Sequence, residues 1–355
     1  MQLRRTWRVA LTAPAAPIAP TALACALALA LTSPGALAWG PKGHKSVGAI
    51  ADQLLAGTPA GKKVRQVLGG NLQTASAWAD CARAVESRQG KWSYTGAGAH
   101  PDCAIFENPA SEHALIDFVQ RNASRCGGFS SSLQCRHKAY HFVDLPLQHP
   151  RYDPALPGTA PNDLVHAINA AITVLQGGKS PAPFDIRSPR EALRLLAHYV
   201  GDMHQPLHVG AIYLDDAGQP LDPATPKEAK DHGNAGGNQI ALGGKKLHAL
   251  WDDVPDKLFK PMLAGPGAAQ AKQVPATAGS DPLLWSAEWA GESTAQAAQV
   301  YAGLKIGKKS VTLAGAEWAA TATEPAYRLS REAMQQEQLV KGGARLAQIL
   351  KALWP

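Results

Sequence analysis

The sequence is poor in the features that define several other classes of protein. After residue 38 no stretch of about 20 residues is continuously apolar, so we expect no transmembrane helix. The five cysteines include no C-x-x-C pair, which argues against a zinc site built from cysteine. The 355 residues contain no internal repeat and no linker dividing two hydrophobic cores. One domain is therefore the simplest organisation.

The first 38 residues have the character of a secretory signal. Three arginines precede a long run rich in alanine and leucine, which ends in the small residues 36–38. We expect cleavage after Ala38, which would leave residues 39–355 as the exported domain, periplasmic or secreted and without a membrane anchor. Cleavage removes three arginines and no acidic residue, so the formal net charge falls from +7 to +4. This mild excess permits a polyanionic substrate without demanding one.

Four cysteines remain after cleavage, and an even number in an exported protein predicts two disulfides. Cys81, Cys103, Cys126 and Cys135 can pair in three ways. We favour Cys81–Cys103 and Cys126–Cys135, because neighbouring cysteines would close short loops.

Apolar residues with helical period dominate the exported part. They predict a mainly α fold, with helices over 44–55, 163–176, 190–204 and 342–354. Two alternating runs joined by Gly243-Gly244 predict one small β-hairpin over 238–250. Long loops are expected over three ranges, 86–138, 213–237 and 261–283.

The stretch LAHYVGDMHQPLH, residues 196–208, concentrates titratable groups inside an apolar helix. His198 and Asp202 lie four residues apart and so share a helix face. An ionised aspartate in such a place is costly unless it is compensated, and a metal ion compensates it well. His208 follows a proline and can approach from another direction, which suits zinc. Taken alone, such a pair is more often a hydrogen-bonded or ion-paired couple, and we assign His204 to that ordinary class.

Similar pairs recur along the chain. His248 and Asp252 lie four residues apart. His141 and Asp144 lie three residues apart, and so do Asp80 and Arg83. After cleavage the chain would begin at Trp39, five residues before His44. The deprotonated α-amino group and the carbonyl of Trp39 could together chelate zinc.

These motifs together resemble the S1/P1 nuclease family, the zinc-dependent nucleases of the mung-bean and fungal single-strand type. That family shares a helical superfamily with the bacterial zinc phospholipases C. The resemblance covers nearly the whole exported part, and the segment HYVGDMHQPLH is close to a signature. It implies a single helical domain of the phospholipase C/nuclease type, with long disulfide-bearing loops. The loop between Asp80 and His141 is much longer than in the fungal enzymes.

The resemblance further implies three zinc ions per chain. The first would be held by Asp80, His141, His198 and Asp202, the second by His208, His248 and Asp252, and the third by Trp39, His44 and the other oxygen of Asp202. Asp202 would then bridge two ions.

Four more residues match positions to which the family gives roles in catalysis or binding. Asp144 would orient the attacking water, Arg83 would contact the phosphate, and Phe142 and Asn238 would contact a nucleobase. Each residue also has a structural interpretation. Asp144 could be a partner of a histidine, and Arg83 could form a helix salt bridge. Phe142 could pack in the core, and Asn238 could shape the hairpin.

The function implied is that of an exported, monomeric endonuclease without an obligate protein partner. It would cleave RNA and single-stranded DNA to 5′-phosphorylated products by attack of a zinc-bound hydroxide. Some family members also attack duplex DNA or remove 3′-phosphates. The alternative is a zinc-dependent phospholipase C, whose ligand set usually ends in glutamate where this chain has Asp252. A purely structural zinc cluster is a third possibility, but it would need neither Asp144 nor Arg83.

Overall fold

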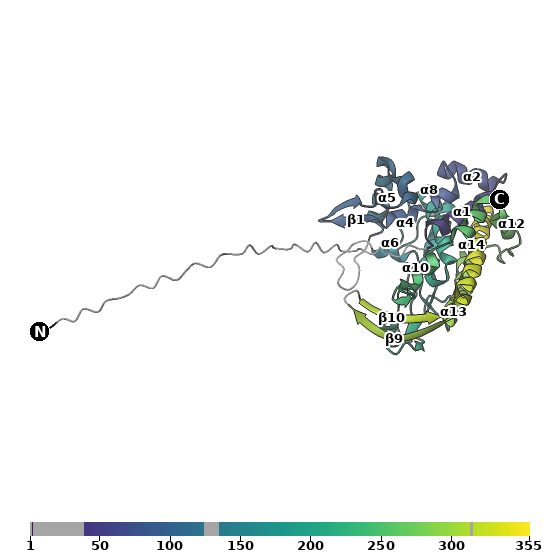
Figure 1. Cartoon of the computed structure of the whole chain (residues 1–355). Helices are drawn as coiled ribbons and strands as arrows, with labels where there is room; N and C mark the ends of the chain where they lie inside the picture. The colour runs from purple at the N-terminus through teal and green to yellow at the C-terminus, as the bar shows by residue number, and fades with distance from the viewer. Residues whose placement is uncertain (1, 3–38, 124–134, 313–314) are drawn as a thin grey trace, which may run out of the picture. The chain divides into compact units, whose positions relative to one another are not determined.

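The computed structural model describes residues 2, 39–123, 135–312 and 315–355 (Figure 1). The chain divides into residues 1–35 and 36–355, and every element described below lies in the second unit. That unit is mainly helical. Its helices are α1 (Pro41–Leu54), α2 (Pro59–Leu68), α3 (Leu72–Ala75), α4 (Trp78–Ala82), α5 (Pro109–Arg121), α6 (Cys135–Ala139), α7 (Leu164–Leu175), α8 (Pro189–Met203), α9 (Pro226–His232), α10 (Leu247–Asp252), α11 (Asp256–Ala264), α12 (Pro266–Ala271), α13 (Pro282–Ala302) and α14 (Ala326–Leu353), with 3-10 turns η1 (Pro101–Phe106) and η2 (Pro206–His208).

Helix α8 lies at the centre of the helical packing. It begins where the Ser188 hydroxyl accepts a hydrogen bond from the amide of Glu191, with Pro189 at the first helical position. Helices α1, α2, α3, α4, α7, α13 and α14 all contact it. Every residue from 195 to 203 is therefore buried, and polar side chains in this range face the protein interior.

The largest sheet has four strands in the order β8-β7-β10-β9, with β7 (Ile240–Leu242) parallel to β10 (Gly315–Ala322) and the other pairs antiparallel. Its outer strands are β8 (Lys245–Lys246) and β9 (Leu304–Thr312). Three two-stranded ladders complete the strands: β1 (Val85–Arg88) with β2 (Lys91–Tyr94), β3 (Leu145–Pro146) with β4 (Gly210–Ala211), and β5 (Tyr213–Leu214) with β6 (Pro220–Leu221). The parallel β3–β4 ladder holds the segment after His141 beside the segment after His208.

The mainly α prediction is confirmed, and helices α1, α7, α8 and α14 cover the four predicted ranges. The predicted hairpin forms, but its second arm is only β8. Residues 247–250 belong instead to helix α10, whose Leu247, His248 and Trp251 are buried. The three buried side chains are spaced for one face of a helix, and this packing outweighs the alternating pattern.

The three predicted loops are wrong in part, because they contain short elements. Segment 86–138 includes β2, η1 and α5, segment 213–237 includes α9, and segment 261–283 includes α12. The β9–β10 hairpin and the long helix α13 were also not predicted. Helix α13 buries serine, threonine and glycine besides tryptophan, so its apolar period is weak.

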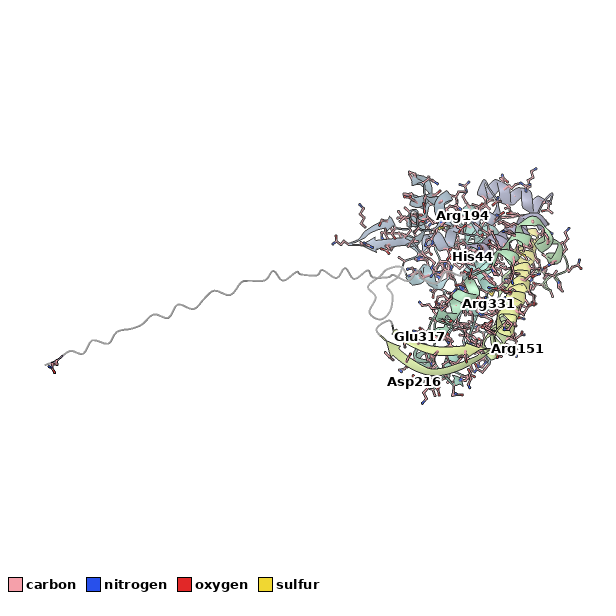
Figure 2. All side chains as sticks on the ribbon, viewed as in Figure 1. His44, Arg151, Arg194, Asp216, Glu317 and Arg331 are labelled. Carbon is pink, nitrogen blue, oxygen red and sulfur yellow. A yellow bond between two sulfur atoms is a disulfide. The ribbon has the colours of Figure 1, made fainter. Side chains whose placement is uncertain are left out.

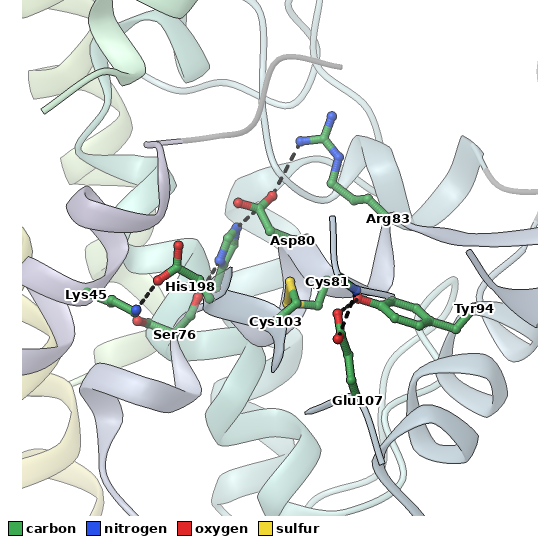
Figure 3. Close-up of a disulfide and its surroundings, with 11 residues drawn as sticks. Lys45, Ser76, Asp80, Cys81, Arg83, Tyr94, Cys103, Glu107 and His198 are labelled. Carbon is green, nitrogen blue, oxygen red and sulfur yellow. Dashed lines mark hydrogen bonds and ion pairs between the residues drawn. A yellow bond between two sulfur atoms is a disulfide. The ribbon is translucent and has the colours of Figure 1, made fainter. Parts of the chain in front are cut away.

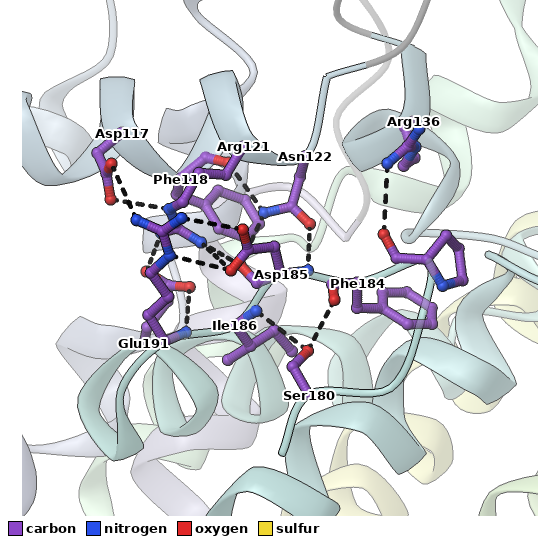
Figure 4. Close-up of polar contacts among 12 residues, drawn as sticks. Asp117, Phe118, Arg121, Asn122, Arg136, Ser180, Phe184, Asp185, Ile186 and Glu191 are labelled. Carbon is purple, nitrogen blue, oxygen red and sulfur yellow. Dashed lines mark hydrogen bonds and ion pairs between the residues drawn. The ribbon is translucent and has the colours of Figure 1, made fainter.

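Two sets of contacts join the segment between Asp80 and His141 to the helical core. Arg121 of α5 donates to Asp117 and to Glu191 at the start of α8, and the amide of Asn122 bonds to the backbone oxygen of Asp185 (Figure 4). The guanidinium of Arg194 on α8 lies 5.5 Å from the ring centre of Trp78 and 5.4 Å from that of Phe106. Figure 2 labels Arg194 among the side chains of the whole molecule. These contacts fix the added segment against α8.

The predicted disulfide Cys81–Cys103 is present. The second predicted pair, Cys126–Cys135, lies outside the side chains that the structure describes, and the predicted signal of residues 1–38 likewise lies outside the described residues, Gln2 excepted. Among the described helices, none is both long and apolar enough to span a membrane.

Candidate metal centre

Six separate parts of the fold bring histidines and aspartates to one buried place. Helix α1 carries His44, α4 carries Asp80, the turn after α6 carries His141, α8 carries His198 and Asp202, η2 carries His208, and α10 carries His248 and Asp252. Their nitrogen and oxygen atoms form three groups, each within 4.8 Å. The groups are His44–Asp80–His198, His141–His198–Asp202 and His208–His248–Asp252.

Backbone carbonyls fix the tautomers of three of these histidines. The Nδ1 atoms of His198, His208 and His248 lie 2.6 Å, 2.7 Å and 2.6 Å from the carbonyl oxygens of Ser76, His141 and Gly236. A carbonyl oxygen can only accept, so each Nδ1 carries the proton and donates it. In its neutral form each ring therefore presents its Nε2 lone pair inward, which is how metal-binding histidines are usually oriented.

Two of these lone pairs face each other. The Nε2 atoms of His208 and His248 are 3.1 Å apart. Burial lowers the pKa of His208 well below its usual value, and that of His248 to about 4, so neither ring gains a proton at neutral pH. Two unprotonated nitrogens at this distance repel each other unless a cation lies against both. This pair therefore fits a metal ion.

The other spacings fit the same interpretation. Two ligands of a tetrahedral zinc ion, each about 2.0–2.1 Å from the metal, lie about 3.3 Å apart. Nε2 of His198 is 3.3 Å from Oδ2 of Asp202 and 3.0 Å from Nδ1 of His141. Nε2 of His248 is 3.4 Å from Oδ2 of Asp252. The donor set of imidazole and carboxylate is also one that zinc accepts.

The two oxygens of Asp202 face different histidines. Oδ1 lies 3.4 Å from Nε2 of His44, and Oδ2 lies 3.1 Å from Nδ1 of His141. Burial raises the pKa of this carboxyl to about 7, although His198 opposes the rise. Among the described residues, Oδ1 of Asp202 and Oδ2 of Asp252 have no hydrogen-bond partner. The same holds for both ring nitrogens of His44. Buried atoms left in this state are costly, and metal ligation would satisfy them.

Two of the remaining histidines, His44 and His141, are in the neutral state that a metal needs. Burial lowers the pKa values of His44 and His141 well below the usual value, and nearby positive charge on His198 adds to the shift. His198 behaves differently: burial lowers its pKa, but Asp202 and Asp80 outweigh burial and leave it raised. His204 belongs to none of the three groups and instead bonds to the carbonyl of Val200.

Sequence reasoning missed the neighbours that shape this centre. The Gln205 amide donates to Oδ1 of Asp252 at 2.8 Å. Gly201 permits close packing of α8 on α1, because a Cβ at this position would lie 2.7 Å from Nδ1 of His44. Both residues belong to the signature segment, which could have identified them. The carbonyls of Ser76 and Gly236 have no sequence signal.

The structure brings together every side chain that the resemblance assigns to metal binding, and the group His208–His248–Asp252 has the composition of one implied site. His44 lies with Asp80 and His198, and its Nε2 is also 3.4 Å from Oδ1 of Asp202, the carboxylate with which the resemblance groups it. Trp39 is buried just before α1, and the neighbouring amide of Gly40 donates to the carbonyl of Asp252. The backbone groups of Trp39 therefore remain proposed ligands.

Arg83 contacts a residue of the centre directly, whereas Asp144 follows the candidate ligand His141 by three residues. Nη1 of Arg83 is 3.5 Å from Oδ1 of Asp80, and Figure 3 shows the contacts running from Ser76 through His198 and Asp80 to Arg83. The positive charge of Arg83 also lowers the pKa values of His141 and His208, so it acts on the centre electrostatically. Burial raises the pKa of Asp144 to about 6.

Of the aromatic and amide candidates for binding a nucleobase, one is exposed and the others contact the rest of the protein. Phe142 is 41% exposed although it adjoins a buried ligand, so it is not a core residue. The Asn238 amide donates to the carbonyl of Ala235 and thus shapes the turn that supports His248. Of three further aromatics, Trp92 packs on the core, and the hydroxyls of Tyr94 and Tyr152 donate to Glu107 and Asp163.

The fold and the centre define a mainly helical protein with buried clusters of histidine and aspartate that could hold several metal ions. Residues 129–354 match the S1/P1 nuclease family, and the chain belongs to this family. No match was found among curated proteins. Membership makes the protein a metal-dependent nuclease, a hydrolase that acts on phosphodiester bonds of nucleic acid. The matched range contains four histidines of the three groups, His141, His198, His208 and His248, but not His44 or Asp80, whose place in the centre comes from the structure.

Proposed function

We propose that the protein is an exported endonuclease with three zinc ions, acting as a monomer on RNA and single-stranded DNA to give 5′-phosphorylated products. The observation that carries the metal assignment is the pair of unprotonated Nε2 atoms of His208 and His248, 3.1 Å apart. The preference for zinc rests on the donor set and its spacing. The preference for unpaired strands rests on Phe142, because an exposed aromatic can stack on any accessible base.

Zinc bound in this centre would supply Lewis-acid chemistry, since it polarises phosphoryl oxygens and acidifies water. The chain itself supplies the other functions. The Arg83 guanidinium would donate two hydrogen bonds to phosphate oxygens as negative charge builds up during attack. The Asp144 carboxylate would orient the attacking water and accept its proton. A pKa of about 6 keeps Asp144 ionised at neutral pH and close to the value best suited to a general base.

Export also bears on the proposed third zinc ion. The signal features of residues 1–38 place the cut immediately before Trp39. Only that cut would free the α-amino group for metal binding. N-terminal sequencing of the exported protein should therefore find Trp39 first, and any other N-terminal residue would remove this ligand from the proposal.

The proposed function is tested by following the release of acid-soluble nucleotides from single-stranded DNA and RNA. The purified protein is assayed directly, after chelation, and after zinc is restored. We expect activity to disappear with the chelator and to return with zinc. His248→Ala should abolish the zinc-restored activity, whereas His149→Ala should retain it, because His149 is a partly exposed histidine paired with Asp222.

Two outcomes would contradict the proposal. A zinc-loaded protein that is inactive on both nucleic acids but hydrolyses phosphatidylcholine would be a phospholipase C. Activity that survives complete removal of metal would separate the centre from catalysis.

A further inference from the structure

Two adjacent residues of η1 are each bonded to a residue that directly follows a candidate metal ligand in the sequence. Asp102 forms an ion pair with Lys45, which follows His44 on α1. Cys103 forms the disulfide with Cys81, which follows Asp80 on α4. Figure 3 shows the Cys81–Cys103 disulfide and Lys45 beside Asp80 and His198.

The two ligands concerned belong to one group. His44 and Asp80, with His198, make up the cluster whose donor atoms lie within 4.8 Å. His44 and Asp80 come from different helices, so their spacing depends on how α1 and α4 are held relative to each other. The segment Asp102–Cys103 connects to both helices one residue beyond the ligands.

Helix α4 needs such support. It has only five residues, and Ala77 at its N-terminus provides no side-chain cap. A helix this short has little stability of its own, because nucleation costs more than one turn of hydrogen bonds returns. Its position is therefore set by tertiary contacts. These are the disulfide and the packing of Trp78 against Arg194.

The ion pair between Lys45 and Asp102 can hold α1 in a fixed position relative to η1. The side chains of Lys45 and Asp102 are 28% and 24% exposed, so water screens their attraction less than that of a surface pair. By contrast, Lys42 on the same helix pairs with Asp256, where the side chains are 45% and 59% exposed. The Lys42 pair thus provides a matched comparison on α1.

We propose that Asp102 and Cys103 are positioning residues, which set the spacing between His44 and Asp80 and thereby the zinc affinity of the group they form with His198. Both residues lie before the matched range 129–354. The inference rests on the proposed function, because it takes these three side chains as metal ligands.

The experiment measures zinc binding rather than turnover. Wild type, Asp102→Asn, Asp102→Glu, the double variant Cys81→Ser/Cys103→Ser and the control Lys42→Met are stripped of metal and titrated with zinc against a chromophoric chelator. Thermal melting of each metal-free protein reports on folding. Loss of an outer residue that orients a ligand typically weakens metal binding by about 10–100-fold.

We expect Asp102→Asn to weaken one zinc ion by about tenfold or more, while the remaining ions bind as in the wild type. The Asp102→Glu variant keeps the charge and should recover most of that affinity. The control Lys42→Met should bind all ions normally. Because Asp102→Asn is nearly isosteric, its metal-free melting temperature should stay close to that of the control, even if the disulfide variant fails to fold.

Other results would overturn the inference in distinguishable ways. Wild-type zinc affinities in Asp102→Asn would refute the positioning role and leave the proposed function intact. The same applies to equal losses in Asp102→Asn and Lys42→Met. A wild-type protein that binds no zinc would overturn the proposed function and this inference together.

Discussion

Protons and zinc should compete for Asp202, and this competition gives a quantitative prediction. Burial raises the pKa of its carboxyl to about 7, so in metal-free protein the group becomes protonated as the pH falls below that value. Zinc must then displace the proton. For each displaced proton the apparent zinc affinity should fall about tenfold per pH unit, or about 1.4 kcal/mol. Between about pH 7 and about pH 5 the loss should reach about a hundredfold.

The other candidate ligands decide whether the apparent zinc affinity depends more steeply on pH than one displaced proton would require. His44, His141 and His208 have pKa values well below the usual one, so they bring no proton to displace in this range. The raised pKa of His198 and that of Asp252 add to the slope. Calorimetric titration with zinc in two buffers of different ionisation enthalpy counts the protons released. Asp202→Asn has no proton to lose at this position and should show a shallower slope.

Protonation of Asp202 weakens zinc binding but stabilises the folded state of the metal-free protein. The folded-state pKa of Asp202 lies above its ordinary value of 3.8, so protonation favours the folded state. The contribution of Asp202 to stability should be greatest below about pH 4 and should fall as the pH rises to about 7, by up to about 4 kcal/mol. The lowered pKa values of His44, His141 and His208 act in the opposite direction, because the unfolded chain gains protons at these histidines below about pH 6.5. Comparison with Asp202→Asn isolates the contribution of Asp202. Chemical denaturation with and without chelator measures this. A zinc affinity that is constant from about pH 5 to about pH 7 would refute the reasoning, as would equal slopes in wild type and Asp202→Asn.

Three further substitutions separate the roles of the residues around the centre. Arg83→Lys keeps a positive charge but loses the guanidinium fork, so kcat should fall by about 10–1,000-fold with unchanged zinc content by metal analysis. Asp144→Asn should lower kcat by about 100-fold or more and remove the acid limb near pH 6 from the pH–rate profile, because the group that titrates there is lost. Phe142→Ala should raise KM for single-stranded DNA by the equivalent of about 1–3 kcal/mol, because a stacking contact with a base is lost. The kcat for a mononucleotide substrate should stay unchanged. An unaltered KM would rule out stacking.

The sequence predicted which histidines and aspartates lie together in the structure, because part of their pairing is encoded locally. His198 with Asp202, and His248 with Asp252, share a helix face wherever those helices lie. The order of the motifs then identified the family. The short elements could not be predicted in the same way. Helix α10 and strand β8 are so short that burial of Trp251, and not local propensity, decides where one ends and the other begins.

By itself the sequence determined which residues can ligate a metal, because donor type and helical spacing are properties of the chain. It also determined the leucine- and alanine-rich surface of α8 that draws the ligands into the interior. Only the tertiary structure decided which nitrogen of each histidine faces inward, because the carbonyls of Ser76 and Gly236 that accept the Nδ1 protons come from distant segments. It alone set His44 beside Asp80, since no local preference can fix the distance between two separate helices.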